Sequence, residues 1–214
     1  TTNFTTTISE SRKVLVGTDI ADLSFPILMS SHGLGTLIFG EDGTLLASFG
    51  DASAFERPDI GNNEKTYVEQ ALEDGIIRAE DNVGAFKAQQ TNNLAGKIIR
   101  INSETGEGLP SNPFYDENAP NAPRSKIWAL GLRNPYRFTF KPESGAHDPS
   151  IGQPGTFIIG DVGWGKWEEL SILKQGGVNF GWPFYEGHQH RWQYWSERVS
   201  NKAAKNTMAD KGGC

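Results

Sequence analysis

Short apolar runs bounded by Gly, Pro, Asn and Asp recur along the chain, a pattern typical of antiparallel strands. The runs comprise residues 35–39, 44–49, 96–101, 136–140, 156–159 and 167–173. Asp42 and Gly43 stand between the first two runs and predict a hairpin. Residues 13–16 are strand-like as well.

One layout occurs twice: a strand, a turn rich in Asp, Glu, Pro and Gly, a second strand, and then Gly-Asp. Gly50-Asp51 closes the first unit and Gly160-Asp161 closes the second. Recurrence of one β-unit at wide spacing is typical of propeller blades. We therefore expect all-β structure, with antiparallel strands around residues 36–49, 96–101, 136–159 and 167–173 arranged radially as consecutive blades.

Two long irregular stretches separate the runs. Residues 52–92 are polar and predict one helix around residues 67–73, whereas residues 103–126 are rich in Pro and Asn. Loops of this length are usually functional or disordered. Residues 1–198 are expected to form the partial propeller, and residues 199–214 a poorly ordered polar tail.

Composition narrows the function classes. The 214 residues include 25 Gly and 11 Pro, which suits a turn-rich β-protein. The net charge of -6 argues against a nucleic-acid partner. No apolar run of about 18 residues predicts a membrane span, and no signal peptide is visible. The single cysteine, Cys214, excludes an internal disulfide.

Four stretches, in the same order as in the family, resemble the glucose/sorbosone dehydrogenase family of soluble quinoproteins. They are residues 31–43 with 50–51, 94–102 with 112–114, 127–135, and 160–163 with 168–169, 176–177 and 179–183. The resemblance implies a six-bladed β-propeller that oxidises an aldose or related sugar with pyrroloquinoline quinone (PQQ) and calcium (Ca²⁺). At roughly 40 to 50 residues per blade, this chain would hold about four blades.

The resemblance implies that His32 is the general base, which takes the hydroxyl proton of the sugar while hydride passes to PQQ. Imidazole suits this task, because its ordinary pKa lies near neutrality. Asp51 matches a family active-site aspartate and is the candidate partner that fixes the tautomer. The alternative is a surface or turn histidine, but the flanking match favours the site.

Arg133 and Asn134 match a pair that contacts the cofactor in the family. PQQ is a tricarboxylate, and a guanidinium holds carboxylate or quinone oxygens through paired donors. The alternative is an Arg-Asn turn before Pro135, with the arginine in a surface salt bridge. The match throughout residues 127–135 favours the site.

The fourth stretch bears on metal binding. By resemblance, the backbone carbonyls of Gly163 and Trp164 bind the catalytic calcium, and such carbonyls are suitable ligands for a hard cation. Val162 departs from the family, whose best-known members have a Gln there, so any cofactor contact by that side chain is lost. Glu169 matches a residue that binds a second, structural calcium in some members; the alternative is an exposed salt bridge.

Late tryptophans form an aromatic group, for which core packing is favoured over a sugar-stacking platform. They are Trp164, Trp167, Trp182, Trp192 and Trp195.

Two other functions stay open. One is a non-catalytic propeller binding module on a secreted or cell-surface protein. The other is a propeller hydrolase such as a lactonase, whose calcium would need converging side chains such as Asp51, Asn134 and Asp161. The enzyme hypothesis implies a sugar substrate, an unidentified electron acceptor and a periplasmic or extracellular location. Exposed edge strands of an incomplete propeller would permit association, including a homodimer.

Overall fold

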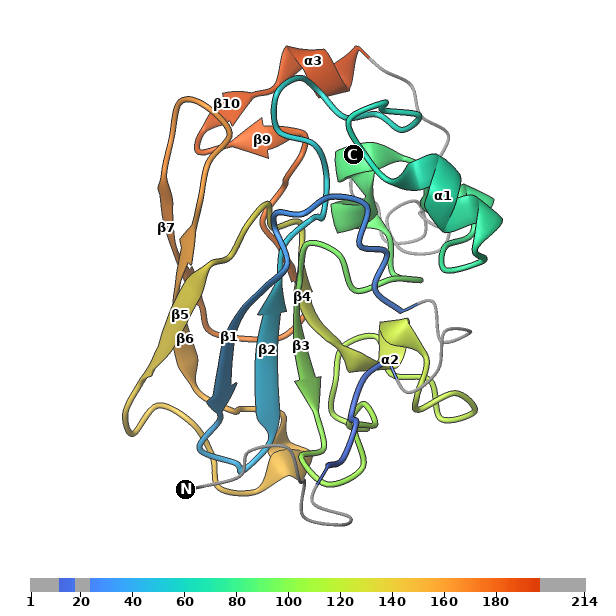
Figure 1. Ribbon diagram of the computed structural model, residues 1–214. Helices are drawn as coiled ribbons and strands as arrows, with labels where there is room; N and C mark the ends of the chain where they lie inside the picture. The colour runs from blue at the N-terminus through green and yellow to red at the C-terminus, as the bar shows by residue number, and fades with distance from the viewer. Residues whose placement is uncertain (1–11, 18–23, 197–214) are drawn as a thin grey trace, which may run out of the picture.

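The computed structural model describes residues 12–17 and 24–196, and strands are the main regular elements of this part of the chain (Figure 1). The predicted polar tail and Cys214 lie outside the described residues. The short helices are α1 (Val68–Glu73), η2 (Ala79–Asp81), η3 (Gly84–Gln89), α2 (Pro123–Lys126), η4 (Pro149–Ile151) and α3 (Trp192–Trp195). Helix α1 confirms the helix expected near residues 67–73. No helix within the described ranges is long and apolar enough to cross a membrane.

The first sheet has five strands in the order β1-β2-β3-β4-β8. They are β1 (Leu34–Phe39), β2 (Leu45–Phe49), β3 (Lys97–Ile101), β4 (Ile127–Leu130) and β8 (Val178–Asn179). The first four are antiparallel neighbours, and β8 runs parallel to β4. Strand β4 was not among the predicted strands.

The assignment of residues 96–101 to a blade of their own is wrong. Strand β3 pairs directly with β2, with Ala47 opposite Ile99, so both belong to one sheet. The physical reason is that period-two alternation determines which face of a strand is buried, but not which strand lies beside it.

The second sheet is an antiparallel meander in the order β5-β6-β7. Its strands are β5 (Arg137–Lys141), β6 (Thr156–Asp161) and β7 (Glu169–Leu173), as the apolar runs predict. The assignment of residues 167–173 to a separate blade is wrong, because β7 pairs directly with β6. A small hairpin of β9 (Tyr185–Glu186) and β10 (Gln189–His190) follows. In Figure 1 this hairpin and α3 lie above the two main sheets.

The two main sheets share one apolar core. Leu46, Ile98 and Trp128 of the first sheet belong to the same buried cluster as Phe157 and Ile159 of the second. Side chains of a strand alternate between faces, so the inward set of each sheet fills this layer. Burial of this layer is the main force that holds the sheets together.

Both sheets also have apolar outer faces. On the first sheet, Leu34 and Leu37 are 53% and 59% exposed beside a hollow of about 570 Å³. Residues 13–16 do not form the expected strand; instead Leu15 packs against this face. On the second sheet, Leu170 and Ile172 are 79% and 59% exposed.

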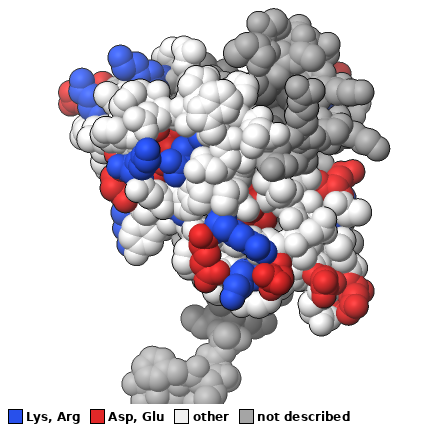
Figure 2. All heavy atoms as spheres, turned by 90° about the horizontal axis from the view of Figure 1, so that it is seen from above, with Lys and Arg blue, Asp and Glu red and all other residues white. Residues whose placement is uncertain are grey.

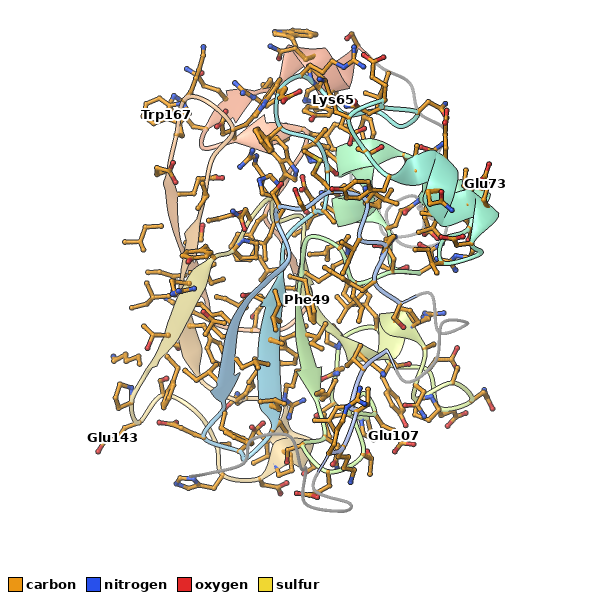
Figure 3. All side chains as sticks on the ribbon, viewed as in Figure 1. Phe49, Lys65, Glu73, Glu107, Glu143 and Trp167 are labelled. Carbon is orange, nitrogen blue, oxygen red and sulfur yellow. The ribbon has the colours of Figure 1, made fainter. Side chains whose placement is uncertain are left out.

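A buried ion pair fastens the lower end of the first sheet, the end at which Figure 3 labels Glu107 and Glu143. Arg100 and Asp42 are both 0% exposed, with 2.7 Å between Nη2 of the arginine and Oδ2 of the aspartate. The guanidinium also donates to Thr44, Ser111, Asn112 and the carbonyl of Pro149. Every guanidinium nitrogen therefore has a partner.

Candidate functional site

Strand direction brings the predicted site residues to one end of the sheets. His32 precedes β1, Asp51 follows β2, Arg133 follows β4 and Gly163 follows β6. Because neighbouring strands are antiparallel, these positions all lie at the upper end in Figure 1. Figure 2 looks onto this end, where acidic and basic side chains are interspersed among uncharged ones.

His32 and Asp51 form a buried pair. Nδ1 of His32 lies 2.7 Å from Oδ1 of Asp51, and the two side chains are 8% and 1% exposed. A carboxylate partner fixes the tautomer in which Nδ1 carries the proton, so Nε2 is left as a proton acceptor. Burial acts to raise the pKa of Asp51, but the hydrogen bond and charge of His32, with the charges of Lys87 and Arg133, hold it below its usual value.

The backbone around this pair is strained. His32 has φ 55° and Ala52 has φ 50°, both in the left-handed region that side-chain-bearing residues rarely adopt. Such a conformation costs about 1–3 kcal/mol and persists where the surroundings enforce it, often at functional sites. At Gly50 an added Cβ would collide with the carbonyl oxygen of His32. Glycine is therefore required beside the histidine.

Trp182 completes the hydrogen bonding of Asp51. Its indole Nε1–H donates to Oδ2 of Asp51 at 2.8 Å, and its side chain is almost fully buried. Sequence reasoning favoured a core role for this tryptophan and missed the bond. Its place in the stretch 179–183 was the only available signal, and that stretch lies 131 positions from Asp51.

Arg133 places a positive charge beside the pair. The side chain is buried, so the alternative of a surface salt bridge is wrong. Nη1 donates to the carbonyls of Val162 and Gly163 at 2.8 and 2.9 Å, and the guanidinium lies 5.5 Å from the ring centroid of Trp182. Nε is buried without a partner among the described residues. The backbone carbonyl of Arg133 accepts from the N–H of Asp51 at 2.8 Å.

Asp161 holds the turn that carries Arg133 and Asn134. Its Oδ2 accepts from the N–H of Arg133 at 2.9 Å, and its Oδ1 accepts from the N–H of Asn134 at 2.6 Å. Burial raises the pKa of Asp161 to about 7 and outweighs these two bonds, which lower it. Asn134 is half-buried, and its carbonyl accepts from the N–H of Val162 at 3.0 Å.

The turn with Gly163 and Trp164 is anchored from the β9–β10 hairpin. Oε1 of Glu186 accepts from the successive N–H groups of residues 164–166 at 2.6, 2.9 and 3.3 Å. Arg191 pairs with Glu186 at 2.9 Å and lies over the ring of Trp164. Successive backbone N–H groups of this kind form a concavity that binds an anion. Here the anion is the carboxylate of Glu186.

A family model described as Glucose / Sorbosone dehydrogenase matches residues 25–211. The chain belongs to the glucose/sorbosone dehydrogenase family. The HIPL2 protein of Arabidopsis thaliana is 31% identical over 159 residues, which are 74% of this chain and 19% of that relative. Aldose sugar dehydrogenase YliI of Escherichia coli (strain K12) is 33% identical over 101 residues, which are 45% of this chain and 22% of that relative.

Among solved structures, the PQQ-bound aldose sugar dehydrogenase of Streptomyces coelicolor is 23% identical, with a TM-score of 0.48. That match covers 77% of this chain and 34% of the other. The chain spans about a fifth of the length of the curated family relatives it matches.

No three His, Cys, Asp or Glu side chains converge on a metal-binding group anywhere in the described ranges. The carboxylates of Asp51 and Asp161 are instead engaged within the protein, which weighs against a lactonase-type calcium site. Glu169 begins β7 opposite Asp161 and accepts from the N–H of Gly187, and it forms no salt bridge with any residue that the structure describes.

The late tryptophans divide into two groups. Trp182 is buried and Trp164 half-buried, as a core role predicts. Trp167, Trp192 and Trp195 are 42%, 75% and 41% exposed, so the core expectation is wrong for these three. Trp167 lies just before β7, and Trp192 and Trp195 lie on α3, at the upper rim in Figures 1 and 3. Trp167 and Trp195 contact the β9–β10 hairpin through His188 and His190.

Proposed function

We propose that the complete protein oxidises an aldose or related sugar, with PQQ as hydride acceptor, calcium as cofactor and His32 as general base. The observation that carries the proposal is the buried His32–Asp51 pair with Arg133 at the same end of the sheets. Membership of the family supports it, as does the name of the relative YliI, an aldose sugar dehydrogenase.

His32 would act through Nε2. Asp51 holds the Nδ1–H, so Nε2 is free to take the hydroxyl proton of the sugar as the carbonyl forms and the adjacent C–H leaves as hydride. When bound, PQQ supplies the hydride acceptor and calcium polarises it. The ionised Asp51 stabilises the imidazolium that results, and a base placed in this way contributes typically about 10²–10⁴-fold to the rate.

The chain offers ligands that suit both cofactors. Arg133 supplies positive charge toward the carboxylates or quinone oxygens of PQQ, and Asn134 lies beside it as a polar contact. The carbonyls of Gly163 and Trp164 would hold the catalytic calcium, and Glu169 a second, structural one. The carbonyl of Gly163 accepts one hydrogen bond from Arg133 and keeps a second lone pair that could face a metal.

The exposed apolar faces support a longer propeller. Each main sheet leaves apolar side chains uncovered on its outer face, as at Leu37 and Leu170. Further blades on both sides would bury these rows, since large exposed apolar patches mark interaction surfaces. We place the two sheets within a six-bladed propeller, in a protein that acts in the periplasm or outside the cell.

A non-catalytic binding module is the second candidate. It is favoured by Val162, which has no side chain for a polar cofactor contact. In that function the buried network would only stabilise the loops at the upper end.

The deciding experiment is titration of the complete protein with PQQ and calcium chloride, followed by dye-linked oxidation assays over a panel of aldoses and sugar alcohols. We expect saturable PQQ binding that strengthens with calcium, and sugar-dependent dye reduction. Absence of PQQ binding would overturn the enzyme hypothesis and leave the binding module.

A further inference from the structure

We propose that Trp182 is a positioning residue for the His32–Asp51 pair, which it locks through its indole N–H while its ring face carries Arg133. The proposal rests on the proposed function for its catalytic consequence. Its structural part, the orientation of Asp51 and through it of the imidazole, stands independently of any activity.

The carboxylate of Asp51 is held by donors from three segments. Oδ1 faces Nδ1 of His32 at 2.7 Å and accepts from the N–H of Ser53 at 3.1 Å. Oδ2 accepts from Nε1 of Trp182 at 2.8 Å. Donors on both oxygens prevent rotation of the carboxylate about its Cβ–Cγ bond. Loss of the indole bond would free one oxygen and leave that buried atom without the donor it has here.

Trp182 is itself well fixed. Its N–H donates to the carbonyl of Gly131 at 2.9 Å, and its carbonyl accepts from Nε2 of Gln89 at 2.6 Å. The ring packs edge-on against Tyr194 with centroids 5.4 Å apart. The position of the indole N–H is therefore fixed by the residue that follows strand β4 and by helix η3, and this position in turn orients Asp51.

The same ring connects the pair to Arg133. The guanidinium lies 5.5 Å from the ring centroid, where the face of the indole attracts a cation. The edge of the indole donates a hydrogen bond to Asp51, and its face attracts the guanidinium of Arg133. Both contacts are made by one rigid ring. Trp182 thus sets the separation between the imidazole and the guanidinium that would face the cofactor.

Trp128 provides a matched control for the indole bond. It is also almost fully buried and lies beneath an arginine, with the guanidinium of Arg100 5.1 Å from its ring centroid. Its Nε1 has no hydrogen-bond partner among the described residues. Trp128→Phe therefore removes the same atoms as Trp182→Phe without breaking a hydrogen bond between described residues. The pair of variants separates loss of the hydrogen bond from loss of packing.

The test compares Trp182→Phe and Trp128→Phe in the complete protein, without PQQ or calcium. Ring ¹⁵N chemical shifts of His32, assigned by their loss in His32→Gln, report its tautomer. We expect the Nδ1–H form to dominate in the wild type and in Trp128→Phe, and a mixed population in Trp182→Phe. If Trp182→Phe keeps the wild-type tautomer, Trp182 is only a packing residue and the proposal is wrong.

Two further measurements check the hydrogen bond and its catalytic consequence separately. In the wild type, the Nε1–H of Trp182 should exchange with solvent at least about 100-fold more slowly than that of the 75% exposed Trp192. Equal rates would contradict the bond without any variant. With PQQ, calcium and sugar, Trp182→Phe should lower kcat about tenfold or more with little change in KM. An inactive wild type with the expected tautomers would refute the proposed function alone.

Discussion

Two buried arginines at opposite ends of the first sheet differ in how completely their hydrogen bonds are satisfied. Arg100 at the lower end and Arg133 at the upper end each lie over a tryptophan, with centroid distances of 5.1 and 5.5 Å. Arg100 pairs directly with the carboxylate of Asp42. Arg133 has two backbone carbonyls, and its Nε lacks a partner among the described residues.

The difference indicates distinct roles. A fully satisfied guanidinium has nothing left to bind, so Arg100 fastens the β1–β2 turn to the loops around Asn112 and Pro149. An incompletely satisfied guanidinium retains hydrogen-bonding capacity, as at Arg133, whose Nε has no partner among the described residues.

The largest expected effect on stability is at the lower end. Arg100→Met leaves Asp42 as an unpaired buried carboxylate and should lower the free energy of unfolding by about 3–5 kcal/mol. Arg133→Met, whose direct partners are neutral carbonyls, should cost clearly less. Urea denaturation of both variants measures the difference. An equal or reversed order would contradict the division of roles between the two ends.

Two glycines beside His32 sharpen the comparison within the upper end. Gly50→Ala would drive a methyl group into the carbonyl oxygen of His32 and should destabilise the protein by about 1–3 kcal/mol. Gly33→Ala meets nothing within 4 Å and should change stability by about 0.5 kcal/mol or less. Thermal unfolding compares the two; similar losses would show that the backbone at His32 is not tightly constrained.

The smallest expected effect concerns how the free energy of unfolding changes at acid pH. The pKa of Asp51 is lowered in the folded state, so its ionised form contributes stability above about pH 4, the unfolded value. This contribution is lost as the pH falls through the lower folded value. Asp51→Asn should cost about 1–2 kcal/mol at pH 7, since one buried donor loses its acceptor. The gap to the wild type should narrow below pH 4 in denaturation series; a constant gap would exclude a lowered pKa.

Much of the local structure could be predicted from the sequence. The hairpin around Asp42, strands β3, β5, β6 and β7, and helix α1 all lie where the pattern places them. Local alternation and turn residues determine these elements. The stretches that resemble the family also identified His32, Asp51, Arg133 and Gly163 as candidate site residues. In the structure, these residues lie at one end of the two sheets.

The errors concern contacts between distant segments. Three contacts could not be predicted: the pairing of β3 with β2, the hydrogen bond from Trp182 to Asp51, and the anchoring of residues 164–166 by Glu186. Each joins segments that lie between 20 and 131 positions apart in the sequence. Nothing local distinguishes a tryptophan that only packs, such as Trp128, from one that also donates to a carboxylate. Tertiary packing decides that, and composition cannot.

The most direct test of the central claim is single-turnover reduction of the PQQ- and calcium-loaded complete protein by sugar, comparing wild type with His32→Ala and Arg133→Ala. His32→Ala should slow the reaction by about 10²–10⁴-fold, with PQQ affinity largely intact. Arg133→Ala should weaken PQQ binding, with activity partly restored by excess cofactor. Near-normal turnover of His32→Ala with PQQ bound would contradict the assignment of His32 as the base.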